Sequence, residues 1–583
     1  MWCARVPLVT AITAAVLWLG TALAEASPRV HDPHQALPVV NVNYIGRQLV
    51  FMSTHYLMRY SGFDGPPGDL RPADGNKPPN INGWQEFFLH WKQQLTSKAV
   101  MGRTFASAVN VSDHLFPVNV FGAGNAPYPG DVRVATIPGQ SCPGQVALVA
   151  GHPDSTPALN TGNGSSYDDT SGVTMGMGEL QALAHWWEAN HAWPERTIKV
   201  ALFDAEEVGL EGSQYYASHL ISPGPQGRYV VVANMDQNGL EYPAYPEGTT
   251  SSTWTPGPWY TNINASPVKD FSIYGPNAHT PPPAIANNMR AIRHFRAALS
   301  ASVRRAFSIL GAQYHFRIPL DNPNEDGKTA PGYRPSDIAR YSPVQDDTLG
   351  RTDQVPFVAL GIPGYGVLGA YDSGSKEDIV GNTPLSPLGN AGLFSQQAGY
   401  DTPEDNMEHF NLLADGNPVA SHITTGLFRA LQLPATWTMY LLARREYVGA
   451  VKQTARPIAY YEALPTVVAP RQRVSFDASG SVSRGGGSLR YYWDFGDRSH
   501  AIGRRISHSY TRAGWYDAVL TVVNSRGQVS GYRTGIRVGE ATRRPATNSC
   551  GTVGASREAH VILENGGSVP AGLPTADRWR SGR

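Results

Sequence analysis

Three short, largely apolar segments constrain the fold of this chain more than any other feature. They span residues 145–150, 197–203 and 229–233. A run that is apolar at consecutive positions is typical of a strand buried on both faces, as in parallel sheets covered by helices. Between the first two runs, apolar residues recur at helical spacing over residues 172–190. This alternation predicts an α/β domain over residues 25–450, with a mixed, mostly parallel sheet flanked by helices.

A different pattern occupies residues 455–539, where short alternating strands recur about every ten residues between glycine turns. This spacing predicts a small β-sandwich. The sequences Trp-Asp-Phe-Gly-Asp at 493–497, His-Ser-Tyr at 508–510 and Gly-Trp-Tyr at 514–516 resemble a PKD-type (Ig-like) domain. Alternation along the strand places Trp493 in the domain core, as we also expect for its neighbour Tyr492. The resemblance implies a module that binds polysaccharide or protein.

The N-terminal residues 1–24 combine one arginine, an apolar stretch and an Ala-Leu-Ala sequence that ends at Ala24. This order is typical of a cleaved secretory signal peptide, so we expect a secreted, extracellular protein. No later segment is apolar enough over about 20 residues to predict a membrane span. Export would remove Cys3 and leave Cys142 and Cys550, which either pair in a disulfide or remain as free or intermolecular thiols.

Charge and periodicity exclude some functions and mark two irregular segments. The chain has 47 basic and 47 acidic side chains and therefore no net positive charge. Nucleic acid is accordingly not predicted as a main partner. Residues 241–283 are rich in Tyr, Pro, Ser and Thr without a clear period, and we interpret them as an insertion near the rim of a site. The polar, aperiodic residues 540–583 predict a flexible tail.

Acidic residues and one histidine follow the three apolar runs. Because the carboxyl ends of parallel strands meet at one edge of a sheet, we expect these side chains to gather there. A histidine together with several carboxylates at such an edge is a candidate metal site. The residues concerned are His152, Asp154, Asp168, Asp169, Glu206, Glu207 and Asp236.

The same segments resemble the di-zinc exopeptidases of metallopeptidase family 28, most of which are aminopeptidases. The most specific part is Glu-Glu-Val-Gly-Leu-Glu-Gly-Ser at residues 206–213. The resemblance spans about residues 118–441 and implies the zinc aminopeptidase type of α/β fold. The matching segments are 151–155, 168–172, 203–213, 234–236, 352–353, 356–357 and 361–363.

The resemblance implies a role for each residue of the candidate site. His152 and Asp236 would bind one zinc ion, Glu207 would bind a second, and Asp168 would bridge the two. Glu206, next to a ligand, would act as the general base. Asp154 would hold the second ring nitrogen of the histidine. The family also has a cis peptide bond after its bridging aspartate, here between Asp168 and Asp169.

The sequence departs from the family at the final metal ligand. The family has a histidine in a Tyr-His-Thr segment, whereas this chain has Asp401 after Tyr400. An all-carboxylate second site suits Mn²⁺ as well as zinc. We considered three interpretations: Asp401 is a working ligand, His409 replaces it, or the second site is empty and activity is impaired. The retention of Glu206 and Glu207 favours the first.

These observations predict a secreted metallo-aminopeptidase that hydrolyses N-terminal peptide bonds through water activated by two divalent metal ions. An alternative is a catalytically impaired relative that binds or adheres through its PKD-type domain. A third hypothesis keeps the fold but changes the reaction to the glutaminyl cyclisation of one-zinc relatives. The sequence leaves open the choice between amino- and carboxypeptidase activity and the preferred side chain at the cleaved bond.

Overall fold

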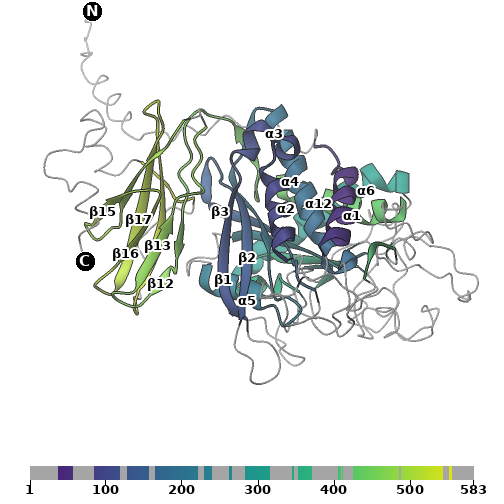
Figure 1. Cartoon of the computed structure of the whole chain (residues 1–583), viewed down its shortest axis with the longest axis horizontal. Coiled ribbons are helices and arrows are strands. Elements are labelled where there is room, and N and C mark those ends of the chain that lie inside the picture. The colour runs from purple at the N-terminus through teal and green to yellow at the C-terminus, as the bar shows by residue number, and fades with distance from the viewer. Residues whose placement is uncertain are drawn as a thin grey trace, which may run out of the picture.

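The computed structural model describes two β-containing domains and the helices that cover the larger one (Figure 1). The described residues are 37–56, 59, 84–118, 128–155, 165–220, 229–238, 261–265, 283–314, 345–346, 352–369, 405–408, 410, 425–484, 487–541 and 550–554. The predicted signal peptide at residues 1–24 lies outside them. None of the helices within these ranges is long and apolar enough to cross a membrane.

The large domain is built on an eight-stranded mixed sheet in the order β1-β2-β5-β3-β6-β9-β7-β8. Strands β5, β3, β6 and β9 run parallel at its centre, while β1, β2 and β7 are antiparallel to their neighbours towards the centre. The strands are β1 (Asn110–Val118), β2 (Tyr128–Ile137), β3 (Cys142–Gly151), β5 (Arg196–Leu202), β6 (Tyr229–Asp236), β7 (Thr261–Ala265), β8 (Gln345–Asp346) and β9 (Gly364–Gly369). The three apolar runs are therefore the adjacent central strands β5, β3 and β6, which confirms the predicted fold class.

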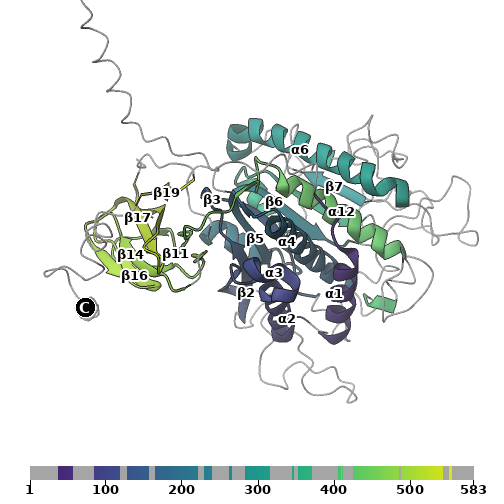
Figure 2. The same ribbon diagram turned by 90° about the horizontal axis from the view of Figure 1, so that it is seen from above.

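Side chains that alternate along the central strands supply two separate cores. Ile198 and Val200 of β5 face the larger core, which the long helices cover, whereas Ala201 faces the smaller one. The helices of the domain are α1 (Val42–His55), α2 (Trp84–Thr96), α3 (Lys98–Ala106), α4 (Ser171–Ala189), α5 (Glu211–Tyr215), α6 (Pro283–Tyr314), α9 (Val355–Ala359) and α12 (Thr425–Ala443). Seen from above, α4 lies amid the other long helices (Figure 2). It is buried along almost its whole length, which explains its weak amphipathic pattern.

The small domain is a β-sandwich of a three-stranded and a six-stranded sheet. Trp493 lies 1% exposed in the core between them, as predicted, whereas Tyr492 is buried but does not belong to that core cluster. The first sheet contains β11 (Glu462–Leu464), β13 (Arg473–Asp477) and β16 (Arg505–Ser509). The second contains β12 (Val467–Val468), β14 (Arg490–Asp494), β15 (His500–Ile502), β17 (Gly514–Val523), β18 (Val529–Val538) and β19 (Thr552–Val553).

Two segments differ from the sequence-based expectation. Residues 241–283 are not wholly an insertion, because Thr261–Ala265 form β7 and pair with β9 inside the large sheet. Residues 540–583 are not wholly a flexible tail, because Thr552–Val553 form β19 and pair with β18. The two strands are only five and two residues long, so any apolar alternation in them is too brief to identify a strand in the sequence.

The two domains are joined at β3, beside which the small domain lies in both views (Figures 1 and 2). Cys142, the first residue of β3, forms a disulfide with Cys550, which settles the question that the sequence left open. The Gly144 N–H donates to the Cys550 carbonyl at 2.9 Å. The short strand β4 (Ala192–Pro194) of the large domain pairs with β10 (Ala450–Lys452), which leads into the sandwich.

A buried ion pair adds charge to this interface. Lys199 of β5 bonds to Glu462 of the small domain, and their side chains are 5% and 20% exposed. Lys199 Nζ also donates to the Tyr216 hydroxyl at 3.1 Å. Burial alone lowers the pKa of Lys199, but the Glu462 carboxylate outweighs it and raises the pKa well above its ordinary value. Lys199 is therefore charged at neutral pH and depends on a carboxylate from the other domain.

We expect Glu462→Gln to lower the free energy of unfolding by about 3 kcal/mol, because it leaves the Lys199 charge buried without its partner. The double variant Lys199→Met, Glu462→Leu should lose much less, since it removes both charges together. Urea denaturation at neutral pH measures both values. Glu540→Gln, which alters an exposed acid on the same domain, is the control. Equal stability of Glu462→Gln and the wild type would show that the pair does not stabilise the interface.

Candidate metal centre

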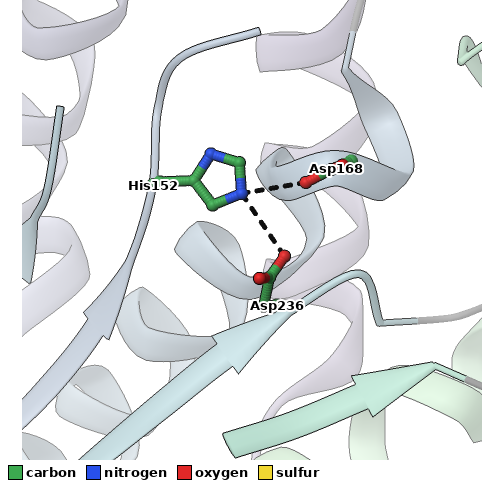
Figure 3. Close-up of side chains that lie close together, drawn as sticks. All are labelled: His152, Asp168 and Asp236. Atoms are coloured by element: carbon green, nitrogen blue, oxygen red, sulfur yellow. Dashed lines mark hydrogen bonds and ion pairs between the residues drawn. The ribbon is translucent and has the colours of Figure 1, made fainter. Parts of the chain in front are cut away.

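The carboxyl ends of adjacent central strands bring one histidine and two aspartates together (Figure 3). His152 directly follows β3, and Asp236 is the last residue of the neighbouring strand β6. Asp168 comes from the Ser166–Thr170 turn that precedes α4. One ligand atom from each of the three lies within 4.8 Å of the others, and all three side chains are buried. The structure thus brings together three of the predicted ligands.

A single histidine nitrogen faces both carboxylates. His152 Nε2 lies 2.8 Å from Asp168 Oδ1 and 3.3 Å from Asp236 Oδ1. Burial opposes a charge on the imidazole, but the charges of Asp236 and Glu206 and the contacts with Asp154 and Asp168 prevail. The pKa of His152 therefore lies well above its ordinary value. The negative potential at this point attracts a cation, whether a proton or a metal ion.

Asp154 connects the histidine to the next strand end. Its Oδ1 lies 3.4 Å from His152 Nδ1, and its Oδ2 accepts the Glu207 N–H at 3.2 Å. The imidazole is therefore oriented with Nε2 towards Asp168 and Asp236 and Nδ1 towards Asp154. A second-layer carboxylate of this kind fixes the tautomer of a metal-binding histidine.

Glu206 and Glu207 lie in the turn that follows β5, and both are half-buried. Burial raises the pKa of Glu206 well above its ordinary value, and the charge of His152 lowers it in part. Glu206 also interacts electrostatically with Asp236 and Asp168, which places it beside the cluster. Glu207 is outside the three-residue group, although its backbone is tied to Asp154.

Asp169 holds the turn that carries Asp168. Its Oδ1 accepts the Gly172 N–H at 2.7 Å and its Oδ2 accepts the His152 N–H at 3.2 Å. It thus caps the first turn of α4, a role typical of aspartate at this position. The peptide bond between Asp168 and Asp169 is cis, which confirms the expectation from the family resemblance. A Cβ on Gly172 would lie 2.1 Å from the Met235 carbonyl, so glycine allows α4 to approach β6 this closely.

Asp353 is a further buried acid near the cluster. Burial raises its pKa to about 8, while the charge of His152 and the Ser213 hydroxyl oppose the increase. Sequence reasoning noted Asp353 only as part of a family segment. Asp401, the predicted final metal ligand, lies outside the described residues, as does the alternative His409.

The donor set fits a divalent metal ion. One imidazole nitrogen and carboxylate oxygens, enclosed away from water, form the ligand chemistry of catalytic zinc sites. The orientation of His152 by Asp154 supplies the outer layer that such sites require. The residues that would hold the ion are His152, Asp168 and Asp236.

Comparison with known proteins agrees with this assignment. Residues 133–261 match the model of peptidase family M28, and residues 454–538 match the model of the PKD domain. The M28 match includes every strand end that contributes to the cluster.

Several solved structures are distantly similar. Glutaminyl cyclase from Porphyromonas gingivalis is 13% identical, with coverage of 69% of this chain and 99% of that one and a TM-score of 0.37. The LapA aminopeptidase of Legionella pneumophila is also 13% identical, with coverages of 69% and 71% and a TM-score of 0.37. A zinc aminopeptidase from Bacillus subtilis is 15% identical, with coverages of 54% and 50% and a TM-score of 0.29. The family matches thus show a segment similar to peptidase family M28, followed by a C-terminal segment similar to the PKD domain.

Proposed function

We propose that this protein is an exported, metal-dependent aminopeptidase that removes N-terminal residues from peptides or proteins. The observation that carries the proposal is the buried cluster of His152, Asp168 and Asp236, located inside the segment that matches peptidase family M28. Export rests on the signal-like sequence at residues 1–24. The PKD domain would bind polysaccharide or protein near the substrate.

The ligand set of the family suggests two zinc ions. His152 and Asp236 would hold one ion, Asp168 would be shared, and Glu207 with Asp401 would hold the second. The four ligand carboxylates and a hydroxide would then exceed the charge of two divalent ions by one negative charge, because Asp401 stands where the family has a neutral imidazole. An all-oxygen second site of this kind also accepts Mn²⁺.

Each residue has a distinct task in peptide hydrolysis. A pair of divalent ions, when bound, polarises the scissile carbonyl and makes the attacking water more acidic. Glu206 takes the proton of that water and passes it to the leaving amine, so the peptide nitrogen departs as a neutral amine. Asp154 keeps His152 Nε2 turned towards the reacting centre. The buried surroundings exclude bulk water and strengthen these charge interactions.

Glu206→Gln should lower kcat about 10²–10⁴-fold, because the amide cannot accept the proton of the attacking water. Metal content should stay at the wild-type value, since Glu206 is not a proposed ligand. The measurements are hydrolysis of aminoacyl p-nitroanilides, with and without a chelator, and metal analysis of the purified full-length chain. Glu86→Gln, at an exposed site on α2, is the matched control.

The wild type separates the competing hypotheses in the same assay. Chelator-sensitive release of p-nitroaniline supports the aminopeptidase. Metal binding without hydrolysis, accompanied by cyclisation of an N-terminal glutaminyl peptide, would replace it with cyclase activity. Absence of both reactions after addition of zinc or manganese would favour the impaired, binding-only protein.

Asp401→Asn should reduce metal content from about two ions per chain towards one, because it removes the charge of a proposed ligand. Asp401→His should keep two ions and shift preference from manganese towards zinc, since imidazole is the softer ligand. Metal analysis after dialysis against each ion gives both results. Loss of an ion in His409→Asn, with none in Asp401→Asn, would instead assign the ligand to His409.

A further inference from the structure

Arg59 is a fully buried cation beside the candidate metal centre. Its side chain is 0% exposed and stacks over the Phe87 ring at 4.6 Å. Placing a guanidinium away from water is costly unless its N–H groups are bonded and its charge is balanced. Its contacts therefore indicate what the buried charge does.

The guanidinium joins the two segments that carry metal ligands. Its Nε donates to the Pro153 carbonyl at 2.6 Å, immediately after His152. Its Nη2 donates to the Thr170 hydroxyl at 2.8 Å and to the Ser165 carbonyl at 3.4 Å. Ser165 and Thr170 lie on either side of Asp168 in the turn before α4. One planar group thus spans the histidine strand end and both sides of the aspartate turn.

The backbone of Arg59 adds to the same link. Its carbonyl accepts the Ser155 N–H at 2.7 Å, and its Nη1 donates to the Tyr56 carbonyl at 2.8 Å. Tyr56 is the C-cap of α1, so the guanidinium is anchored to a helix of the main core. The loop of residues 152–155 is thereby fixed at two points to one residue.

Asp405 holds the aspartate turn from another side. Its Oδ1 accepts the Tyr167 N–H at 2.7 Å, and its Oδ2 accepts the Asp168 N–H at 2.9 Å. Burial raises the pKa of Asp405 to about 7, while these two hydrogen bonds and the Arg59 charge oppose the increase. The backbone of Asp168 is therefore fixed by the Asp405 carboxylate.

We propose that Arg59 and Asp405 are positioning residues that hold His152 and Asp168 at metal-binding separation before the metal arrives. The proposal rests on the proposed metal-dependent function. Carboxylates gathered in a dry site repel one another and would separate without a cation. Arg59 supplies permanent positive charge behind the ligands, and its fixed fork of donors sets the distance between their two loops. A site ordered in advance binds its metal more tightly because less order is lost on binding.

The test measures metal affinity in the full-length chain, which does not depend on peptide hydrolysis. Arg59→Met and Asp405→Asn should each weaken zinc and cobalt affinity about 10–100-fold in competition with a chromophoric chelator. The visible absorption spectrum of the cobalt form should change, because the ligand geometry is no longer fixed. Arg59→Lys should recover part of the affinity, since it restores the charge but not the planar fork. Arg103→Met, at an exposed site on α3, is the control.

Circular dichroism of the metal-free variants shows whether a loss of metal affinity is due to unfolding of the chain. Asp405→Asn is the milder change, because the amide keeps one acceptor oxygen and nearly the same shape. Wild-type affinity and cobalt spectrum in folded Arg59→Met and Asp405→Asn would overturn the proposal. A wild type that binds metal but hydrolyses no peptide would overturn the proposed function and leave the positioning role intact.

Discussion

Negative charge held away from water at the carboxyl edge of the large sheet is the constraint on which the surrounding structure depends. Asp154, Asp168, Asp169, Asp236 and Asp353 are all buried there. Their charges are balanced in part by a histidine whose pKa is raised and by carboxyls that hold their protons more strongly, Asp353 to about pH 8. A divalent ion is the partner that would allow all of them to ionise together.

The scaffold supplies this site from parts of the chain that are far apart in sequence. The Arg59 guanidinium meets the Pro153 carbonyl across 94 positions, and Asp405 meets the Asp168 backbone across 237. Such contacts fix the ligands because each loop is bonded to an element that the core already holds in place. The positions of the ligands therefore depend on the packing of α1, β3 and β6.

The small domain is fixed to the strands β3 and β5 of the same sheet. The disulfide from Cys142 reaches β3, which ends at the candidate metal centre, and the Lys199–Glu462 ion pair reaches the neighbouring strand β5. A charged residue in the middle of β5 would be unfavourable in the large domain alone, since its neighbours along that face belong to an apolar core. The large domain thus contains a buried cation that is paired with Glu462 of the small domain.

The sequence by itself determined the central strands, the helix after β3, the PKD core and the residues at the strand ends. These features can be recognised locally, because burial on one or both faces of an element gives its apolar residues a regular spacing in the sequence. The strands β7 and β19 are too short to carry a clear signal, and the sequence placed them in a predicted insertion and a predicted tail. Asp405 stands at the aspartate of the family segment that begins at Tyr400, but the sequence assigned no role to it.

Only the tertiary structure decided which distant residues meet. The pairing of Cys142 with Cys550, of Lys199 with Glu462, and of Arg59 with the loops around His152 and Asp168 has no local pattern. Each of these contacts depends on where the packed core places two chain segments. A buried polar group needs a hydrogen-bond or ion-pair partner from the protein, because water does not reach it. That partner often belongs to a distant segment of the chain.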